Sequence, residues 1–123
     1  MKIAINRCYG GFGLSDEAFE RLLNLKGIEF EKRPAKFSLY SEKHDYWDKG
    51  HAGEDEHFLT HYTFTGWENR TDPDLISVIE EMGEKSWGSH SELNIVDVPD
   101  DVEWQIAEYD GIEWVAEKHR TWR

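Results

Sequence analysis

Apolar and polar positions in the first third of the chain predict a strand followed by a helix. Residues 2–8 alternate in polarity, and their isoleucines favour an extended backbone. Beyond a glycine-rich loop, Ser15 suits the cap of a helix over about residues 16–26, where apolar side chains recur at helical spacing. Gly27 is placed to end that helix. The following stretch indicates two short strands around Pro34.

The middle of the chain has a different pattern. Residues 42–56 show little periodicity and predict a long irregular loop. Its two aromatic residues stand among acids and glycines, so we expect this loop to be mobile or to contact another subunit, and to contribute nothing to the core. Residues 57–64 alternate again and predict another strand.

A second helix is clearly marked. Asp72 can cap it, Pro73 fits its first turn and Gly83 can end it, which predicts a helix over residues 73–82. Residues 94–98 follow as a strand.

The last third of the chain predicts a β-hairpin. Asp110-Gly111 is a strong two-residue turn signal, and alternation on both sides of it places Ile106, Ile112 and Trp114 at apolar positions. The 123 residues contain no visible repeat, so we predict one domain over residues 1–123. Its class is α+β: an antiparallel-rich mixed sheet with two helices packed against it and a C-terminal β-hairpin.

Charge narrows the functional classes. The chain has 26 acidic and 14 basic residues, a net charge of −12, which argues against general binding to nucleic acid or to anionic membranes. The acids concentrate between Asp72 and Glu117, either as a solvated surface or as a mimic of nucleic-acid charge. No segment has the apolar length of a membrane span, and a lone Cys8 excludes an intramolecular disulfide. We therefore expect a cytoplasmic protein.

The glycine-rich loop is the first candidate binding site. Its glycines can direct backbone N–H groups at an anion, Arg7 can pair with a phosphate, and Tyr9 and Phe12 offer rings on which a base can stack. The alternative is that the glycines only make a tight turn between strand and helix. The candidate ligand-binding residues of this segment are Asn6, Arg7, Tyr9, Gly10, Gly11 and Phe12.

Two further segments carry candidate ligand contacts. Arg70 precedes the second helix and can join its N-terminus in holding a phosphate, unless it is a surface arginine near Glu68 or Asp72. The basic C-terminal tail KHRTWR either is frayed or docks through its tryptophan. The candidates in the tail are His119, Arg120 and Trp122.

Catalytic and metal chemistry have weaker signals. Histidines 44, 51, 57 and 61 stand among acids, but no HExxH motif occurs, and we expect no metal and no cofactor. Cys8 with His119 as its base would be a nucleophile, although a buried cysteine at a strand end is the simpler interpretation. We expect no catalytic residue and no enzymatic activity.

The opening INRCYGGFGLS, the segment DPDLISVIEEMGE and the closing EYDGIEWVAEKHRTW resemble small bacteriophage proteins that open with an NRC(F/Y)GGF segment. The chain is similar in these parts to phage anti-Thoeris sponges, and residues 42–56 have no counterpart. The resemblance implies a phage-encoded immune-evasion protein that sequesters a cyclic ADP-ribose-type signal, or a related cyclic nucleotide, without cleaving it in the host bacterial cytoplasm. It supplies no residue-by-residue site.

The residues themselves favour the same kind of function. Arginines and aromatic rings near glycine-rich and terminal segments suit a small phosphorylated, nucleotide-like ligand. A domain this small has little room for a deep pocket, so we expect a homodimer or a higher homo-oligomer. Two alternatives stay open: an acidic inhibitor that binds a protein by mimicking nucleic-acid charge, and a small nucleotide-processing enzyme.

Overall fold

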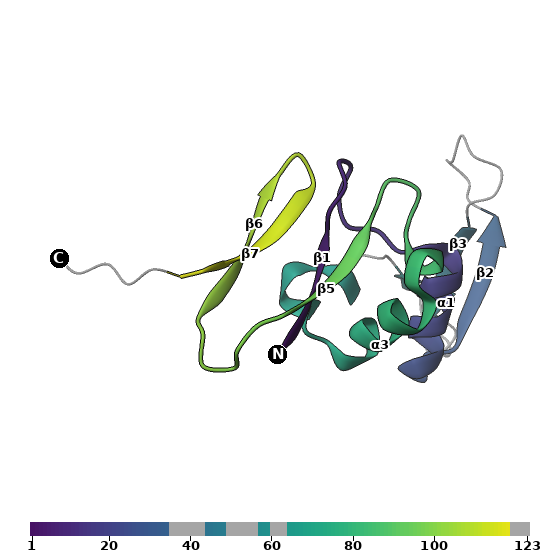
Figure 1. The fold of residues 1–123 in the computed structure, drawn as a ribbon. Coiled ribbons are helices and arrows are strands. Elements are labelled where there is room, and N and C mark those ends of the chain that lie inside the picture. The colour runs from purple at the N-terminus through teal and green to yellow at the C-terminus, as the bar shows by residue number, and fades with distance from the viewer. Residues whose placement is uncertain (35–43, 49–56, 60–63, 119–123) are drawn as a thin grey trace.

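A computed structural model describes residues 1–34, 44–48, 57–59 and 64–118, and its elements are arranged as Figure 1 shows. In chain order they are β1 (Lys2–Asn6), α1 (Asp16–Leu25), β2 (Phe30–Pro34), β3 (His44–Asp48), β4 (His57–Leu59), η1 (Trp67–Asn69), α3 (Pro73–Met82), η2 (Gly83–Ser86), β5 (Leu93–Asp97), β6 (Trp104–Tyr109) and β7 (Ile112–Glu117). The predicted α+β class and the C-terminal hairpin are confirmed. No helix in these ranges is long and apolar enough to cross a membrane.

The strands form three small antiparallel sheets instead of the single expected sheet. Strand β1 pairs with β5, β3 lies between β2 and β4, and β6 pairs with β7. Strand β7 lies beside β1, yet the two do not pair, because other groups use the free edge of β1. The Ala4 N–H donates to the Arg70 carbonyl at 2.8 Å, and the Asn6 N–H donates to the Glu113 carboxylate at 2.9 Å.

Both predicted helices begin and end at the signals in the sequence. The Ser15 hydroxyl accepts a hydrogen bond from the Ala18 N–H at 3.1 Å, so it caps α1. The Asp72 carboxylate accepts one from the Asp74 N–H at 3.2 Å and caps α3. Gly83 follows α3 with a φ of 57°, a left-handed conformation that glycine adopts without strain. These contacts are local, which is why the sequence predicts them.

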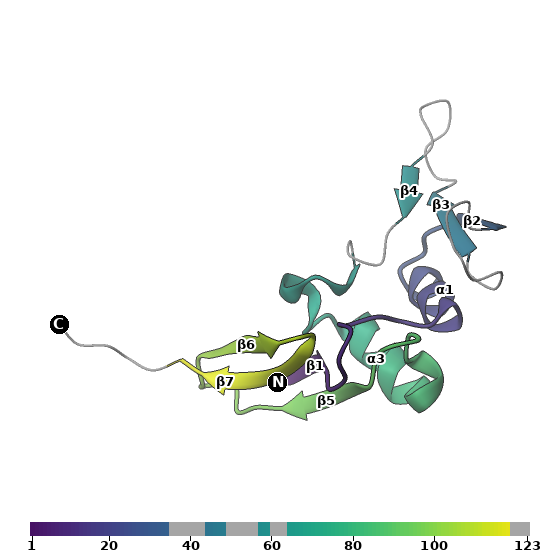
Figure 2. The same cartoon turned by 90° about the horizontal axis from the view of Figure 1, so that it is seen from above.

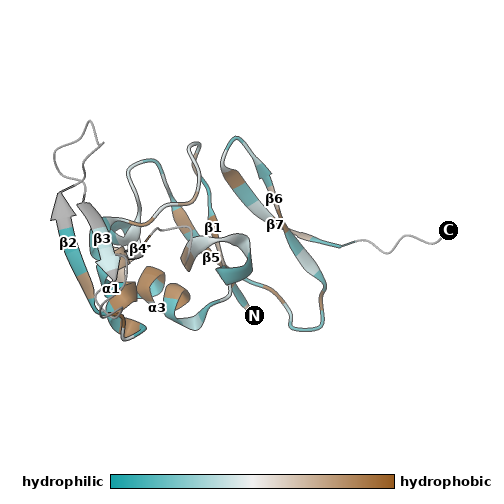
Figure 3. Ribbon diagram, turned by 180° about the vertical axis from the view of Figure 1, so that it is seen from behind, coloured by the Kyte–Doolittle hydropathy of each residue, from teal (hydrophilic) through white to brown (hydrophobic). Residues whose placement is uncertain are grey.

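The interior consists of two apolar clusters on opposite faces of β1. Ala4 packs with the buried faces of α1 and α3, and apolar residues gather on these helices in Figure 3. Ile3 and Ile5 point the other way and pack with Ile106 beneath the hairpin. The helices and the hairpin therefore cover different faces of β1, and burying apolar area on both sides stabilises the arrangement.

Residues 44–48 lie within the loop predicted over 42–56, and the expectation that this loop adds nothing to the core is wrong at Tyr46. They form β3, and Tyr46 is only 1% exposed. Its ring centroid lies 5.1 Å from that of Phe19 and 5.5 Å from that of Phe30. Pairing with β2 and β4 gives this polar segment backbone partners that its own pattern does not reveal. The rest of 42–56 lies outside the described residues.

The two strands of the hairpin differ: β6 buries Ile106 as the apolar pattern predicts, whereas β7 turns the other side inward. On β7, Glu113 is 5% exposed and Trp114 is 47% exposed, so the predicted apolar face points outward there. Glu113 is inside because it pairs with Arg70. Strand β4 covers three residues of the strand predicted over 57–64, and Phe64 lies in a helical turn.

Candidate ligand-binding site

The glycine loop after β1 folds directly against the turn of the hairpin. The Gly10 N–H donates to the Asp110 carbonyl at 3.4 Å. Gly10, Gly11 and Gly111 have φ values of 117°, 99° and 89°, which disfavour any side chain. A Cβ on Gly111 would lie 2.4 Å from the Gly11 nitrogen. The two backbones therefore touch at a place where only glycine fits.

An open hollow of about 520 Å³ lies beside this backbone contact. Its lining consists of Tyr9, Gly10, Gly11, Glu108, Asp110 and Gly111. The Tyr9 ring is 64% exposed. The hollow falls within the size range of small-molecule sites, about 300–1,000 Å³. Half of its lining residues are candidates named from the sequence, so the structure brings part of the predicted loop site together.

The electrostatics of the hollow differ from the local positive charge expected there. Glu108 and Asp110 contribute two exposed carboxylates to the lining, and none of the lining residues is basic. Arg7 is exposed on the same loop, and its backbone N–H donates to the Glu92 carbonyl at 2.8 Å. The hollow thus suits the N–H and amino groups of a ligand, whereas a phosphate is better placed toward Arg7.

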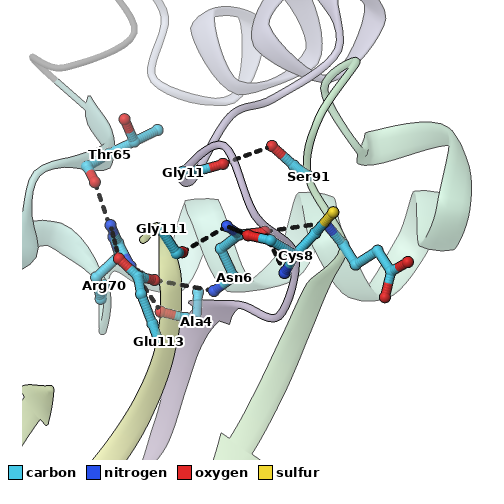
Figure 4. Close-up of polar contacts among 10 residues, drawn as sticks. Ala4, Asn6, Cys8, Gly11, Thr65, Arg70, Ser91, Gly111 and Glu113 are labelled. Carbon is cyan, nitrogen blue, oxygen red and sulfur yellow. Dashed lines mark hydrogen bonds and ion pairs between the residues drawn. The ribbon is translucent and has the colours of Figure 1, made fainter. Parts of the chain in front are cut away.

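Asn6 holds the loop from inside and has no hydrogen-bonding capacity left for a ligand. Its side-chain amide donates to the Cys8 carbonyl at 2.7 Å and to the Gly111 carbonyl at 2.8 Å (Figure 4). Its oxygen accepts from the N–H groups of Cys8 at 3.3 Å and Glu92 at 2.9 Å. These four bonds use both donors and both acceptor sites of the amide. Asn6 is a positioning residue that joins the loop to the hairpin.

Arg70 is also turned inward, so its interpretation as a surface arginine near Glu68 or Asp72 is wrong. Its guanidinium binds the Glu113 carboxylate at 2.5 and 3.0 Å, as Figure 4 shows. The same group donates to the Thr65 carbonyl at 2.8 Å and to the Ala4 carbonyl at 3.3 Å. Four of its five N–H donors are thereby used, and the charge of Arg70 is balanced inside the protein.

Phe12 lies over this buried arginine. The guanidinium carbon of Arg70 is 3.9 Å from the centre of the Phe12 ring, a cation–π distance. The ring is partly buried and packs against the core cluster of the helices. This face of Phe12 is therefore occupied, which leaves Tyr9 as the aromatic residue of the loop that lines the hollow.

Glu113 is the buried partner of Arg70 that the sequence did not reveal. It occupies the polar position of an alternating strand, which by pattern alone belongs to the surface. The signal that could have found it is the two-residue turn at Asp110-Gly111, which pairs Ile106 with Val115 and so puts Glu113 on their apolar face.

Other candidates are placed only in part. His119, Arg120 and Trp122 lie outside the described residues, so the predicted tail contacts stay predictions. Cys8 is half-buried, and its proposed base His119 is one of those residues. Within the ranges that the structure describes, no group of three or more His, Cys, Asp or Glu residues is arranged to hold a metal ion.

The chain matches no protein-family model, no curated protein and no solved structure. The chemistry of the hollow and the placement of charges around it therefore carry the inference of function.

Proposed function

We propose that this protein is a binding protein that holds a small nucleotide-type ligand in the hollow between the glycine loop and the hairpin turn, and sequesters it without converting it. The observation that carries the proposal is the exposed ring of Tyr9 beside the side-chain-free backbone of Gly10, Gly11 and Gly111. A flat ring can approach such a backbone closely while it stacks on the phenol.

Stacking supplies the first part of the affinity. A base on an aromatic side chain contributes about 1–3 kcal/mol. The close backbone contact between the glycine loop and the hairpin turn holds the loop that carries Tyr9 in place. This contact needs glycine at position 111, because a larger residue there would collide with Gly11. A binding surface that is already ordered in the free protein loses less entropy when the ligand binds.

The two carboxylates of the lining supply specificity. Glu108 and Asp110 can accept hydrogen bonds from the ring N–H and amino groups of a base. They repel phosphate, so a phosphorylated ligand extends away from them toward the exposed Arg7, where a guanidinium can bind two phosphate oxygens. The ligand in this arrangement spans the loop, with its base at Tyr9 and its phosphates near Arg7.

The resemblance to phage anti-Thoeris sponges names the ligands to test first, which are cyclic ADP-ribose-type signals and related cyclic nucleotides. On this proposal the protein is phage-encoded and acts in the cytoplasm of the host bacterium. The hollow is open to solvent, and a homodimer whose second copy covers it would enclose more of the ligand.

Calorimetric titration tests the proposal. Cyclic ADP-ribose, a cyclic dinucleotide and ADP-ribose are titrated into the wild type and into Tyr9→Ala, Arg7→Ala and Trp67→Ala. Trp67 is the matched control, because it is 54% exposed but does not line the hollow. We expect at least one ligand to bind, and Tyr9→Ala to weaken it about tenfold.

Arg7→Ala is expected to weaken binding of the phosphorylated ligand without lowering the melting temperature, and Trp67→Ala to change neither. The proposal is wrong if none of the three ligands binds the wild type, or if Tyr9→Ala keeps full affinity. An Arg7→Ala protein with unchanged affinity and a lower melting temperature would remove Arg7 from the site.

A further inference from the structure

The outward face of the hairpin is apolar and carries no charge. Its side chains, which alternate with those facing β1, are Gln105, Ala107, Tyr109, Ile112, Trp114 and Ala116. Tyr109 is 67% and Trp114 47% exposed. The strand register places Ala107 opposite Trp114 and Tyr109 opposite Ile112, so these side chains form one continuous stripe. Exposed aromatic residues of this kind are typical of interaction surfaces.

The edge of the hairpin beside this stripe is also open. Among the described strands, β6 pairs with β7 alone, and it lies on the side of the hairpin away from β1 (Figures 1 and 2). The Lys118 N–H donates to the Glu103 carbonyl at 2.9 Å, which shows that the odd-numbered residues of this segment bond to the β7 side. The backbone groups of Trp104, Ile106 and Glu108 therefore point to the other edge.

No backbone group in the described part of the chain bonds to that edge. An edge with free N–H and C=O groups can accept an added strand, and an apolar stripe beside it can receive the strand's side chains. Proteins usually protect such edges, so an open one next to exposed aromatic residues favours a docking role over a passive surface.

The charges around the hairpin select the kind of partner. Among the described residues near its ends and edge, the exposed charges are mostly acidic, and only Lys118 is basic: the acids are Asp101, Glu103, Glu108, Asp110 and Glu117. Another copy of β6 added edge to edge would bring the same carboxylates together and be repelled, whereas a basic segment would be attracted.

We propose that the hairpin is the docking surface for an extended, basic segment of a partner protein, which adds to β6 as a third strand. Its side chains alternate: those next to Ala107 and Tyr109 are apolar, and those next to Glu108 are lysine or arginine. This inference goes beyond ligand sequestration, because it rests on the open edge and the outward stripe, and it holds whether or not a nucleotide binds.

Amide exchange measured by NMR tests the strand directly. The probe is an eight-residue peptide of alternating valine and lysine, blocked at both ends, added at low salt to the isotope-labelled full chain. We expect exchange at the amides of Trp104, Ile106 and Glu108 to slow at least about tenfold, because each gains a hydrogen bond, while neighbouring amides that already bond to β7 change less.

Two peptides and two variants serve as controls. A peptide with glutamate for lysine and one with proline at alternate positions are expected not to bind, because the first is repelled and the second lacks N–H donors. Trp114→Ala is expected to weaken the valine-lysine peptide about tenfold, and Trp67→Ala to leave it unchanged.

Several results would overturn the proposal: no binding of the valine-lysine peptide, equal binding of the glutamate peptide, or binding without slower exchange at the three amides. Slower exchange that appears without peptide and grows with protein concentration would assign the edge to a second copy, and would also overturn it.

Discussion

The guanidinium of Arg70 and the carboxylate of Glu113 form a two-point ion pair in the interior, with the two residues only 3% and 5% exposed. The pair joins the segment before α3 to strand β7, across the edge of β1. It also supplies hydrogen-bonding partners to the backbone of Ala4 and Asn6. Side chains thus attach the hairpin at a place where a continuous sheet would use backbone pairing.

Removing one partner of this pair leaves the other charge buried and uncompensated. We expect Arg70→Met and Glu113→Gln each to lower the free energy of unfolding by about 3–5 kcal/mol. The matched control is Lys2→Ala, which breaks the exposed Lys2–Glu80 pair and is expected to cost no more than about 1 kcal/mol. Urea denaturation followed by circular dichroism measures all three.

The double variant Arg70→Met with Glu113→Leu separates charge from packing. Since it leaves no buried charge, we expect it to be more stable than either single variant. If Arg70→Met costs no more than Lys2→Ala, the pair does not attach the hairpin in solution.

Two glycines with positive φ test the contact between the loop and the hairpin turn. Gly111 has a φ of 89° and no room for a Cβ, whereas Gly27 has a φ of 70° and nothing within 4 Å. Gly27→Ala is therefore expected to lower the free energy of unfolding by about 1–2 kcal/mol, through backbone strain alone. Gly111→Ala is expected to lower it by distinctly more, because its Cβ also collides with the loop. Urea unfolding curves of the two proteins give the comparison, and equal losses would contradict the close contact.

The buried phenol of Tyr46 is expected to make the stability of the protein depend on pH in the alkaline range. Burial raises the pKa of its phenol, with the nearby carboxylates of Asp16 and Glu20 adding to the effect. A group whose pKa is raised in the folded state makes its full contribution to the free energy of unfolding below its pKa in the unfolded chain, here 10.0. That contribution is lost as the pH rises above this value. We therefore expect wild-type stability to fall above about pH 10.

The variant Tyr46→Phe separates this contribution from that of the lysine side chains, which also titrate above about pH 10. The variant loses the hydrogen bond from the Tyr46 hydroxyl to the Glu20 carboxylate, at 3.2 Å. We expect this loss to lower the free energy of unfolding by about 1 kcal/mol at neutral pH. Its stability should fall less steeply than that of the wild type above pH 10, as measured by chemical denaturation at a series of pH values. Parallel curves would show that Tyr46 ionises in the folded protein as easily as in the unfolded chain.

Local signals explain which parts of the fold the sequence predicts. Ser15 and Asp72 cap the helices through contacts within three residues, and Asp110-Gly111 sets the hairpin within two. The separation of β7 from β1 depends instead on Arg70 and Glu113, which are far apart in sequence. Contacts of that kind leave no periodic trace, so the pattern could not predict them.

Only some of the candidate site residues line the hollow, for a related reason. Tyr9, Gly10 and Gly11, which are candidates from the composition of the loop, line the hollow. Asn6 and Arg70 have the hydrogen-bonding groups that recognise ligands, but the same groups satisfy the protein's own backbone and Glu113. Residue type tells what a side chain can bind, and only the packed structure shows which partner it has.

The claim that the hollow sequesters a nucleotide-type ligand unchanged is tested most directly by mass spectrometry of the small molecules released on denaturation. The protein is purified from cells that produce a cyclic ADP-ribose-type signal, alongside Tyr9→Ala and Trp67→Ala. We predict that the wild type and Trp67→Ala release the intact signal and that Tyr9→Ala releases little or none. Release of a cleaved product, equal release from Tyr9→Ala, or no released ligand from the wild type would contradict the account.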